Sequence, residues 1–527
     1  MQLSIGNLYG GLVAAIIALP LAIAFGMASG LGAAAGLYGA IFLGFFAAAF
    51  GGTKTQISGP TGPMTVVVAS MVPVFEGNLA LITATFMLAG LLQILFGLLK
   101  IGSAVRYIPY PVISGFMNGI GVIIILLQVN TALGAAATSS VLDTLLHLGR
   151  SLASVDPASL MLTLAALAIV VLTPRRITTV IPSPLIALVG LSLLCYLFGI
   201  SVVTVSDIPM GLPVFVVPEF SMTQFSFMMT SALTLAVLGS IDSLLTSLVA
   251  DSITRKKHDS NRELVGQGIG NGVAALFGGL PGAGATMRTV INIKSGATGP
   301  ASGMIHAVIL LLILLVLAPL AEHIPMPVLA GILIKVGLDI LDMRMLKQID
   351  KAPRPDLAVM LAVFGLTVFV DLIVAVGVGV VLAAFMIIRR LTRETQVEIS
   401  SAECVTDDKE DRITDEGIRV VNITGAFFFG STTRIVEEVE KVYDVTAVVI
   451  DCSCVPFMDL SAVYALSDTL DRLRGTGSQV FLVTDYRRKD RLLELGIGDF
   501  IDPTHIFPTQ ESAIQAARSA IASAPAS

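Results

Sequence analysis

The chain has 527 residues, of which 55% are hydrophobic and 13% charged, and its mean hydropathy is +0.87. This composition lies outside the usual range of soluble proteins and predicts that a lipid bilayer surrounds most of the chain. Its four cysteines exclude a disulfide framework. The net charge of −6 is unevenly distributed, because residues from 401 onward carry 21 acidic and 12 basic side chains, which leaves 17 acidic and 20 basic in the first 400.

About fourteen apolar segments between residues 12 and 389 approach the roughly 20 residues that a helix needs to cross a bilayer. The clearest cover residues 12–29, 79–99, 108–128, 159–173, 181–200, 226–249, 301–321, 326–343, 356–371 and 372–389. Segments 34–50, 61–75, 264–278 and 285–297 are shorter or rich in glycine. We therefore expect a polytopic α-helical membrane protein with fourteen spans.

Basic residues occur in alternate loops, which indicates the orientation of the spans, because positively charged short loops stay in the cytoplasm. With the N-terminus inside, the predicted outside loops contain only Arg150. The predicted inside loops carry Lys54, Lys100, Arg106, Arg175, Arg176, Arg255, Lys256, Lys257, Arg262, Arg344, Lys347, Lys351, Arg354, Arg389, Arg390 and Arg393. This pattern predicts an inner (plasma) membrane protein with both termini in the cytoplasm.

Two glycine-rich segments, residues 51–65 and 278–289, resemble each other. Both begin with Gly-Gly and reach a turn of small residues before a short apolar helix. They lie about 225 residues and about seven spans apart, and an odd number of spans in each half places the two halves in opposite orientations. We therefore expect inverted repeats over about 8–200 and 226–390 within a transport domain of residues 1–395.

The apolar segments end after Arg393, and an acidic linker at 407–411 precedes an alternation of strands and amphipathic helices. Strands are predicted at 418–428, 447–452 and 479–484, and helices at 461–474, 487–495 and 511–522. This pattern predicts a separate small α/β domain at about 403–524.

The two Gly/Pro segments are the first candidates for a binding site. Backbone that leaves helical geometry at membrane depth must be buried or line a cavity, since unpaired amides are costly in lipid. If Thr61 and Thr286 each open a half-helix, the free amides beside Gly62 and Ala285 point toward the midplane and favour an oxyanion. The alternative is that residues 58–63 form an ordinary loop between spans.

Asp242 and Thr246 are four residues apart and share one helical face, and a carboxylate within a span needs a partner. Sodium would accept these oxygens together with the carbonyls of Gly284 and Ala285 and the hydroxyl of Thr286. Asp242 could instead carry a proton or be structural. Arg288, one turn into the second half-helix, either attracts the anion or balances Asp242.

No constellation of catalytic residues is present. The five histidines are scattered, and the sequence has no Walker loop, no G-x-S-x-G turn and no Cys/His spacing for zinc. We therefore expect neither an enzyme nor an ATP-driven pump, and no organic cofactor or nucleic-acid partner.

Residues 59–63 (GPTGP), 284–289 (GATMRT) and 456–462 (PFMDLSA) resemble the sulfate permease (SulP) family, as do residues 10–12 and 18–26. The resemblance extends over the whole chain. It implies fourteen spans as seven plus seven inverted repeats, a core domain that moves against a gate domain, and a cytoplasmic STAS domain. It also implies a homodimer in contact with membrane lipid and a possible cytosolic regulator of the STAS domain.

Within this family, residues 240–251 (SIDSLLTSLVAD) are most similar to BicA-type sodium-dependent bicarbonate transporters. This likeness implies a sodium site of Asp242, Thr246, Gly284, Ala285 and Thr286, with bicarbonate held at Thr61 and Ala285. It predicts sodium-coupled bicarbonate uptake by alternating access. Many relatives carry Glu at the position of Asp242 and are thought to couple to protons, so proton-coupled sulfate or dicarboxylate uptake is the alternative. A third hypothesis is an anion-sensing receptor or motor.

Ser461 aligns with the phosphorylated serine of bacterial anti-sigma antagonists, which resemble the STAS domain. This resemblance leaves two roles for Ser461, either as a phosphorylation site or as the residue that caps the following helix.

Overall fold

The computed structural model describes residues 4–103, 108–136, 138, 140–178, 181–205, 213–321, 323–370, 372–405, 412–442 and 445–523. The chain forms two compact units, Met1–Val381 and Leu382–Ser527. Of the features predicted above, Arg106 and the acidic linker at 407–411 lie outside the described residues.

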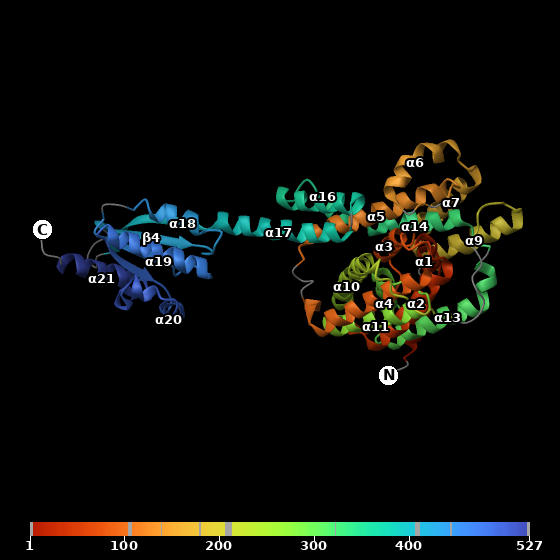
Figure 1. Cartoon of the computed structure of the whole chain (residues 1–527), viewed down its shortest axis with the longest axis horizontal. Helices are drawn as coiled ribbons and strands as arrows, with labels where there is room; N and C mark the ends of the chain where they lie inside the picture. Colours follow the sequence, from red (N-terminus) through yellow and green to blue (C-terminus); the bar gives the residue numbers. More distant parts are fainter. Residues whose placement is uncertain are drawn as a thin grey trace. The chain divides into compact units, whose positions relative to one another are not determined.

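The first unit is helical (Figure 1). Its helices are α1 (Ile5–Ala28), α2 (Ala33–Phe50), α3 (Gly62–Met71), α4 (Leu79–Leu98), α5 (Tyr110–Ala132), α6 (Val141–Ala153), α7 (Pro157–Leu172), α8 (Arg175–Thr178), α9 (Ser183–Phe198), α10 (Phe225–Thr254), α11 (Ser260–Leu276), α12 (Thr286–Lys294), α13 (Ala301–Ala321), α14 (Met326–Ile340), α15 (Met343–Leu346), α16 (Arg354–Phe369) and the start of α17 (Leu372–Glu394).

Each apolar segment predicted from the sequence coincides with one of these helices. Among the described residues, six helices are long and apolar enough to cross a membrane, and α6 with α7 adds a pair bent by 117°. Helices α3 and α9 and residues Ala301–Val316 of α13 are shorter apolar helices. The amphipathic helix α6, which carries Arg150 in its last turn, was not predicted. The count of fourteen spans stays a prediction.

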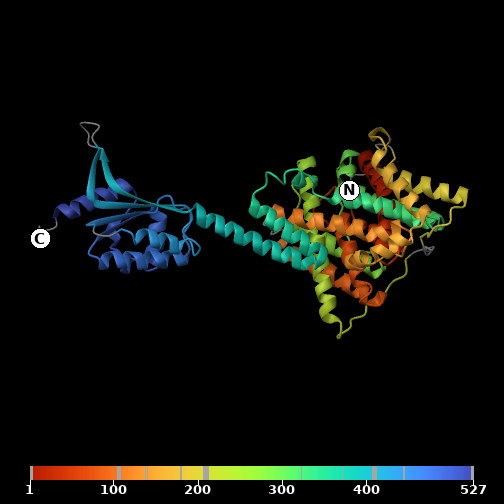
Figure 2. The same ribbon diagram turned by 90° about the horizontal axis from the view of Figure 1, so that it is seen from above.

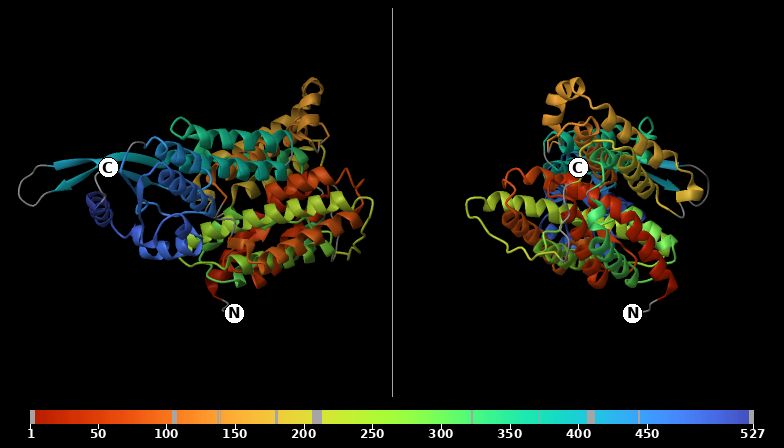
Figure 3. Two further views of the ribbon diagram at one scale, coloured as in Figure 1. Left: turned by 60° about the vertical axis from the view of Figure 1, so that its left-hand side comes forward. Right: turned by 90° about the vertical axis from the view of Figure 1, so that its right-hand side faces the viewer.

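The helices of the first unit pack in two groups. The core group contains α1 to α4 and α10 to α13, while the gate group contains α5, α6, α7, α9, α14 and α16. In Figure 3, α10 (yellow-green) runs beside α4 in the core group. Each group takes helices from both halves of the sequence, as the inverted repeat predicts.

The two Gly/Pro segments leave helical geometry within the core group, as predicted. Strand β1 (Ser58–Gly59) pairs antiparallel with β2 (Ala283–Gly284), with Ser58 opposite Gly284 and Gly59 opposite Ala283. Thr61 is the N-cap of α3, and Ala285 is the N-cap of α12. The pairing therefore holds the amino ends of two half-helices side by side, and this confirms that each segment opens a half-helix.

The second unit contains a five-stranded sheet in the order β3-β4-β5-β6-β7 (Figure 2). Its strands are β3 (Gln396–Val405), β4 (Arg412–Thr424), β5 (Ala447–Asp451), β6 (Gln479–Val483) and β7 (Ile506–Phe507). Strands β3 and β4 are antiparallel, and the other neighbours are parallel.

Alternating side chains of the central strands enter two apolar cores. One core packs against α18 (Thr432–Val439), α19 (Leu460–Gly475) and α20 (Tyr486–Glu494), and the other packs against α21 (Gln510–Ser523). The strands and helices predicted from the sequence are present, and β3, β7 and α18 are additional.

The proposed capping role of Ser461 is wrong. Helix α19 begins at Leu460, and its N-cap is Asp459, whose carboxylate accepts a hydrogen bond from the Ala462 amide at 2.9 Å. Asp459 also accepts from the Phe429 amide at 3.0 Å, so it ties two loops together. Ser461 lies within the first turn and is exposed.

Two cysteines that are close in sequence differ in their expected reactivity. Burial, followed by the negative charge of Asp451, raises the pKa of the Cys452 thiol to about 12, whereas Cys454 is exposed. Because the thiolate is the reactive form, maleimide at pH 8 should label Cys454 at least about tenfold faster than Cys452.

This difference can be measured on the folded protein in a Cys404→Ser background, with Cys195 buried. The fast labelling should disappear in Cys454→Ser and persist in Cys452→Ser. Loss of fast labelling in Cys452→Ser instead would contradict the assignment.

Candidate functional site

The structure brings together three of the residues predicted to bind sodium. The Thr246 hydroxyl donates to the Gly284 carbonyl at 2.9 Å and lies 2.7 Å from the Thr286 hydroxyl. Thr246 belongs to α10 and is fully buried, whereas Gly284 ends β2 and Thr286 opens α12. The turn between β2 and α12 thus places a carbonyl and a hydroxyl against α10.

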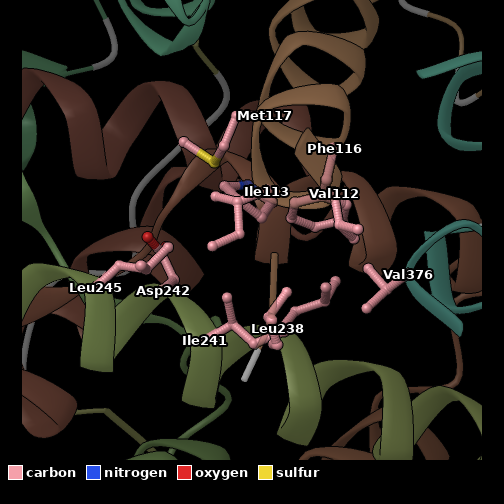
Figure 4. Close-up of a pocket in the computed structure, with 11 residues that line it drawn as sticks. Val112, Ile113, Phe116, Met117, Leu238, Ile241, Asp242, Leu245 and Val376 are labelled. Atoms are coloured by element: carbon pink, nitrogen blue, oxygen red, sulfur yellow. The ribbon is translucent and has the colours of Figure 1, made fainter. Parts of the chain in front are cut away.

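Asp242 lies one turn before Thr246 on α10 and points into a pocket between α10 and α5 (Figure 4). Asp242 is the only charged residue among the eleven that line this pocket. The other lining residues are Pro63, Ile108, Val112, Ile113, Phe116, Met117, Leu238, Ile241, Leu245 and Val376. A carboxyl group in such surroundings needs a positive partner or a proton.

Arg288 supplies part of that positive charge. Its side chain is 2% exposed, interacts electrostatically with Asp242, and donates through Nη2 to the Pro60 carbonyl at 2.6 Å. A Cβ atom at Gly59 would lie 2.6 Å from Nη1, so only glycine lets the guanidinium approach β1 this closely. Arg288 therefore offsets part of the Asp242 charge and supports β1, and its other predicted role, attraction of the anion, stays a prediction.

Thr61 and Ala285 present different groups at the two N-caps. The Thr61 hydroxyl is buried and near enough to the Asp242 carboxylate to interact with it, yet it makes no hydrogen bond of normal geometry within the described chain. The Ala285 amide is already engaged, since it donates to the Ile57 carbonyl at 2.8 Å. The amides available to an anion are therefore those of the first turns of α3 and α12, which lack intrahelical partners.

A carboxylate on α11 that the sequence analysis missed holds the extended segment before β1. Glu263 is 1% exposed, and its Oε2 accepts from the amides of Gly52 and Thr53 at 2.9 and 2.8 Å. Its Oε1 accepts from the carboxamides of Gln56 and Gln267, each at 2.8 Å. The buried charge thus meets four donors.

Other polar side chains fix the partner strand. Asn271 on α11 accepts from the Gly282 amide at 2.9 Å and donates to its carbonyl at 3.0 Å. The Ser243 hydroxyl on α10 accepts from the Gly284 amide at 3.0 Å. Glu263, Gln267 and Asn271 follow one another at four-residue spacing in an otherwise apolar segment, and this spacing is the signal that could have identified them.

Comparison with known proteins agrees with this architecture. The model of the Sulfate permease family matches residues 5–363, and the STAS domain model matches residues 411–513. The chain belongs to the sulfate permease family. It is therefore a multi-pass membrane protein and a secondary anion transporter with a C-terminal STAS domain.

Among curated relatives, the chain is 43% identical to the bicarbonate transporter BicA of Synechocystis sp., over 97% of this chain and 93% of that protein. It is 32% identical to the putative sulfate transporter YvdB of Bacillus subtilis, over 89% of each. Relatives named for two different anions thus align with most of this chain.

Two solved structures show the same fold. The transmembrane domain of a cyanobacterial bicarbonate transporter BicA matches 71% of this chain and 97% of that chain, with 49% identity and a TM-score of 0.66. SLC26A9 matches 98% of this chain and 90% of that chain, with 19% identity and a TM-score of 0.86. The second likeness establishes the fold alone.

Close contact between β1 and β2 makes Gly282 a sensitive position. A Cβ atom there would lie 2.0 Å from the Gly59 carbonyl oxygen, which is backbone and cannot rotate away. We expect Gly282→Ala to cost about 1–3 kcal/mol by forcing the strands apart and to lower the melting temperature of the purified transporter by several degrees.

Gly272→Ala is the matched control, because a Cβ atom at Gly272 on α11 meets nothing within 4 Å. Melting can be followed by size-exclusion chromatography after stepwise heating. Equal melting temperatures for the two variants would show that the strands do not pack this closely.

Proposed function

We propose that the chain is a sodium-coupled symporter that carries bicarbonate into the cell by alternating access. The observation that carries this proposal is the convergence of Thr246, Gly284 and Thr286 beside Asp242. Hydroxyl, carbonyl and carboxylate oxygens are the ligands that a hard monovalent cation prefers. Bound sodium would neutralise Asp242 in its apolar pocket.

The anion would bind next to this cation, between the amino ends of α3 and α12. Two helix amino ends contribute partial positive charge at the same point, and Thr61 offers an additional hydroxyl. The anion would then gain from the sodium charge and sodium from the anion charge, which is reciprocal coupling. The proposed substrate residues are Thr61, Gly62, Ala285, Thr286 and Arg288, with Ala285 acting through its small side chain rather than its amide.

The placement of the site at the boundary of the two helix groups supports alternating access. Asp242 and Pro63 belong to the core group, whereas Val112, Ile113, Phe116 and Met117 of α5 form the opposite wall of the pocket. Movement of the core group against α5 would expose the site to one side of the membrane and then to the other. We propose that the protein works as a homodimer in the inner membrane of the cell. Both termini of each subunit would lie in the cytoplasm.

Proton-coupled uptake of sulfate or a dicarboxylate is the second candidate. The apolar lining of the Asp242 pocket favours it, because such surroundings stabilise a neutral carboxylic acid over a carboxylate. YvdB, named as a putative sulfate transporter, belongs to the same set of relatives. The two candidates differ in the ion that neutralises Asp242.

Sodium replacement tests the proposed coupling. In proteoliposomes, bicarbonate uptake should fall at least about tenfold when external sodium is replaced by choline, because the Asp242 charge, which Arg288 offsets only in part, then repels the anion. In Asp242→Asn, uptake should no longer respond to sodium. The readout is the initial rate of labelled bicarbonate uptake at fixed pH.

Asp339→Asn is the control, since Asp339 pairs with Lys335 on α14 in the gate group and should leave the sodium response intact. Wild-type uptake that is equal in choline and sodium, and that rises with an inward proton gradient, would reject sodium coupling in favour of the second candidate.

Thr61 permits a test of the anion site that leaves the fold intact. Because its hydroxyl makes no normal hydrogen bond within the described chain, Thr61→Val should not lower thermal stability. If the hydroxyl binds the anion, its loss should raise the KM for bicarbonate about tenfold, the effect of one hydrogen bond to a charged group.

Thr83→Val on α4 is the matched variant, because the Thr83 hydroxyl is also buried and also makes no hydrogen bond of normal geometry in the described structure. Its KM should equal that of the wild type. An unchanged KM in Thr61→Val would remove Thr61 from the anion site.

A further inference from the structure

A polar cavity lies away from the apolar Asp242 pocket, at the ends of two core helices. It has a volume of about 370 Å³ and is bounded by the C-terminal ends of α10 and α12 and by the segment 52–55 that precedes β1. From its charge and walls we propose that this cavity is a second anion site, which binds a phosphate group.

The lining of the cavity is strongly basic. Lys54, Lys256 and Lys257 line it, together with one carboxylate, Asp251. Three ammonium groups and one carboxylate leave a net charge of +2 when His258 is neutral. Such a lining matches a dianion better than a monovalent one, and lysine is a common ligand of phosphate.

The only carboxylate of the lining is already engaged. Asp251 Oδ2 lies 2.7 Å from His258 Nδ1, and His258 Nε2 lies 2.9 Å from the Ser260 hydroxyl. With the proton on Nδ1, a neutral imidazole donates to Asp251 and accepts from Ser260, so every polar atom of the ring is satisfied. The His258 side chain is only 3% exposed, so the partner of the Asp251 carboxylate is shielded from solvent.

Helix carboxyl ends would by themselves favour a cation, but here several of the carbonyls near these ends already accept hydrogen bonds. The Asp251 carbonyl accepts from the Arg255 amide at 2.7 Å, and the Ala250 carbonyl accepts from the Thr254 hydroxyl at 2.8 Å. On α12, the Asn292 carbonyl accepts from the Ala297 amide at 3.1 Å. The lysine charges therefore dominate the field in the cavity.

The cavity is connected to the transport site. Thr53 lines it, and the Thr53 hydroxyl lies 2.7 Å from the Ser247 hydroxyl, directly after Thr246 on α10. Ala250 and Thr254, one and two turns beyond Thr246, continue the same helical face into the cavity. A bound phosphate group would bridge the end of α10 and the segment before β1, next to the residues that hold the proposed transport site.

Binding of inorganic phosphate tests this proposal on the purified full-length protein. In sodium-free detergent solution, calorimetry should show saturable binding that weakens about tenfold or more in Lys256→Gln/Lys257→Gln, since two charged donors are lost. Lys347→Gln/Lys351→Gln is the control, because it removes two exposed lysines outside the cavity and should bind like the wild type. Lys54→Gln provides a second test should the first variant prove misfolded by size-exclusion chromatography.

The source of the phosphate group is distinguished by two further probes. Glycerol phosphate tests a soluble phosphomonoester, and nanodiscs of phosphatidic acid against phosphatidylcholine test a lipid headgroup. Lysine-dependent binding of any of these probes supports the site and identifies its source. Absence of lysine-dependent binding for all of them would overturn it.

Asp242→Asn separates this site from the transport site. The variant should bind phosphate as the wild type does, because the cavity does not contain Asp242. Loss of phosphate binding in Asp242→Asn with retention in Lys256→Gln/Lys257→Gln would place the anion at the transport site and overturn the proposal. The result does not depend on whether sodium or a proton drives uptake.

Discussion

The pairing of β1 with β2 is the constraint on which the transport unit depends. A helix satisfies its own backbone, whereas residues 52–61 and 278–285 leave helical geometry among helices that belong in a membrane, where each unpaired amide costs several kcal/mol. The two strands pair part of this backbone with each other, and the side chains of Glu263, Ser243 and Asn271 accept hydrogen bonds from further amides. Helices α3 and α12 can therefore begin side by side. The candidate anion site depends on this arrangement, because it lies between their amino ends.

The buried charges near the amino ends of α3 and α12 also serve more than one purpose. Arg288 reaches across to Pro60 and at the same time interacts with Asp242, so one buried cation supports a strand and compensates a carboxylate. The compensation leaves Asp242 facing apolar side chains of α5. A carboxylate in that position favours a mobile cation, and the helix amino ends beside it favour an anion. The proposed coupling of sodium to bicarbonate would rest on these two features together.

Much of this architecture could be predicted from the sequence because the signals are local. Apolar length predicts the helices, the Gly/Pro turns predict the two half-helices, and the four-residue spacing places Asp242 and Thr246 on one face. Long-range contacts could not be predicted, since the Arg288 bond to Pro60 joins residues 228 apart. Ser461 was misassigned because serine and aspartate both cap helices, and only the start of α19 at Leu460 selects Asp459. Strand β3 escaped detection because it is a polar edge strand.

Antiparallel pairing across the two halves also determines when, during synthesis, β1 can form its hydrogen bonds. Gly284 follows its partner Ser58 by 226 residues. A ribosome must therefore translate the whole first half and the start of the second before β1 can pair with β2. During that interval α3 is delivered to the insertion machinery with an open edge beside it. A truncated first half should then be recognised by membrane quality control, and the two halves should mature only when they are present together.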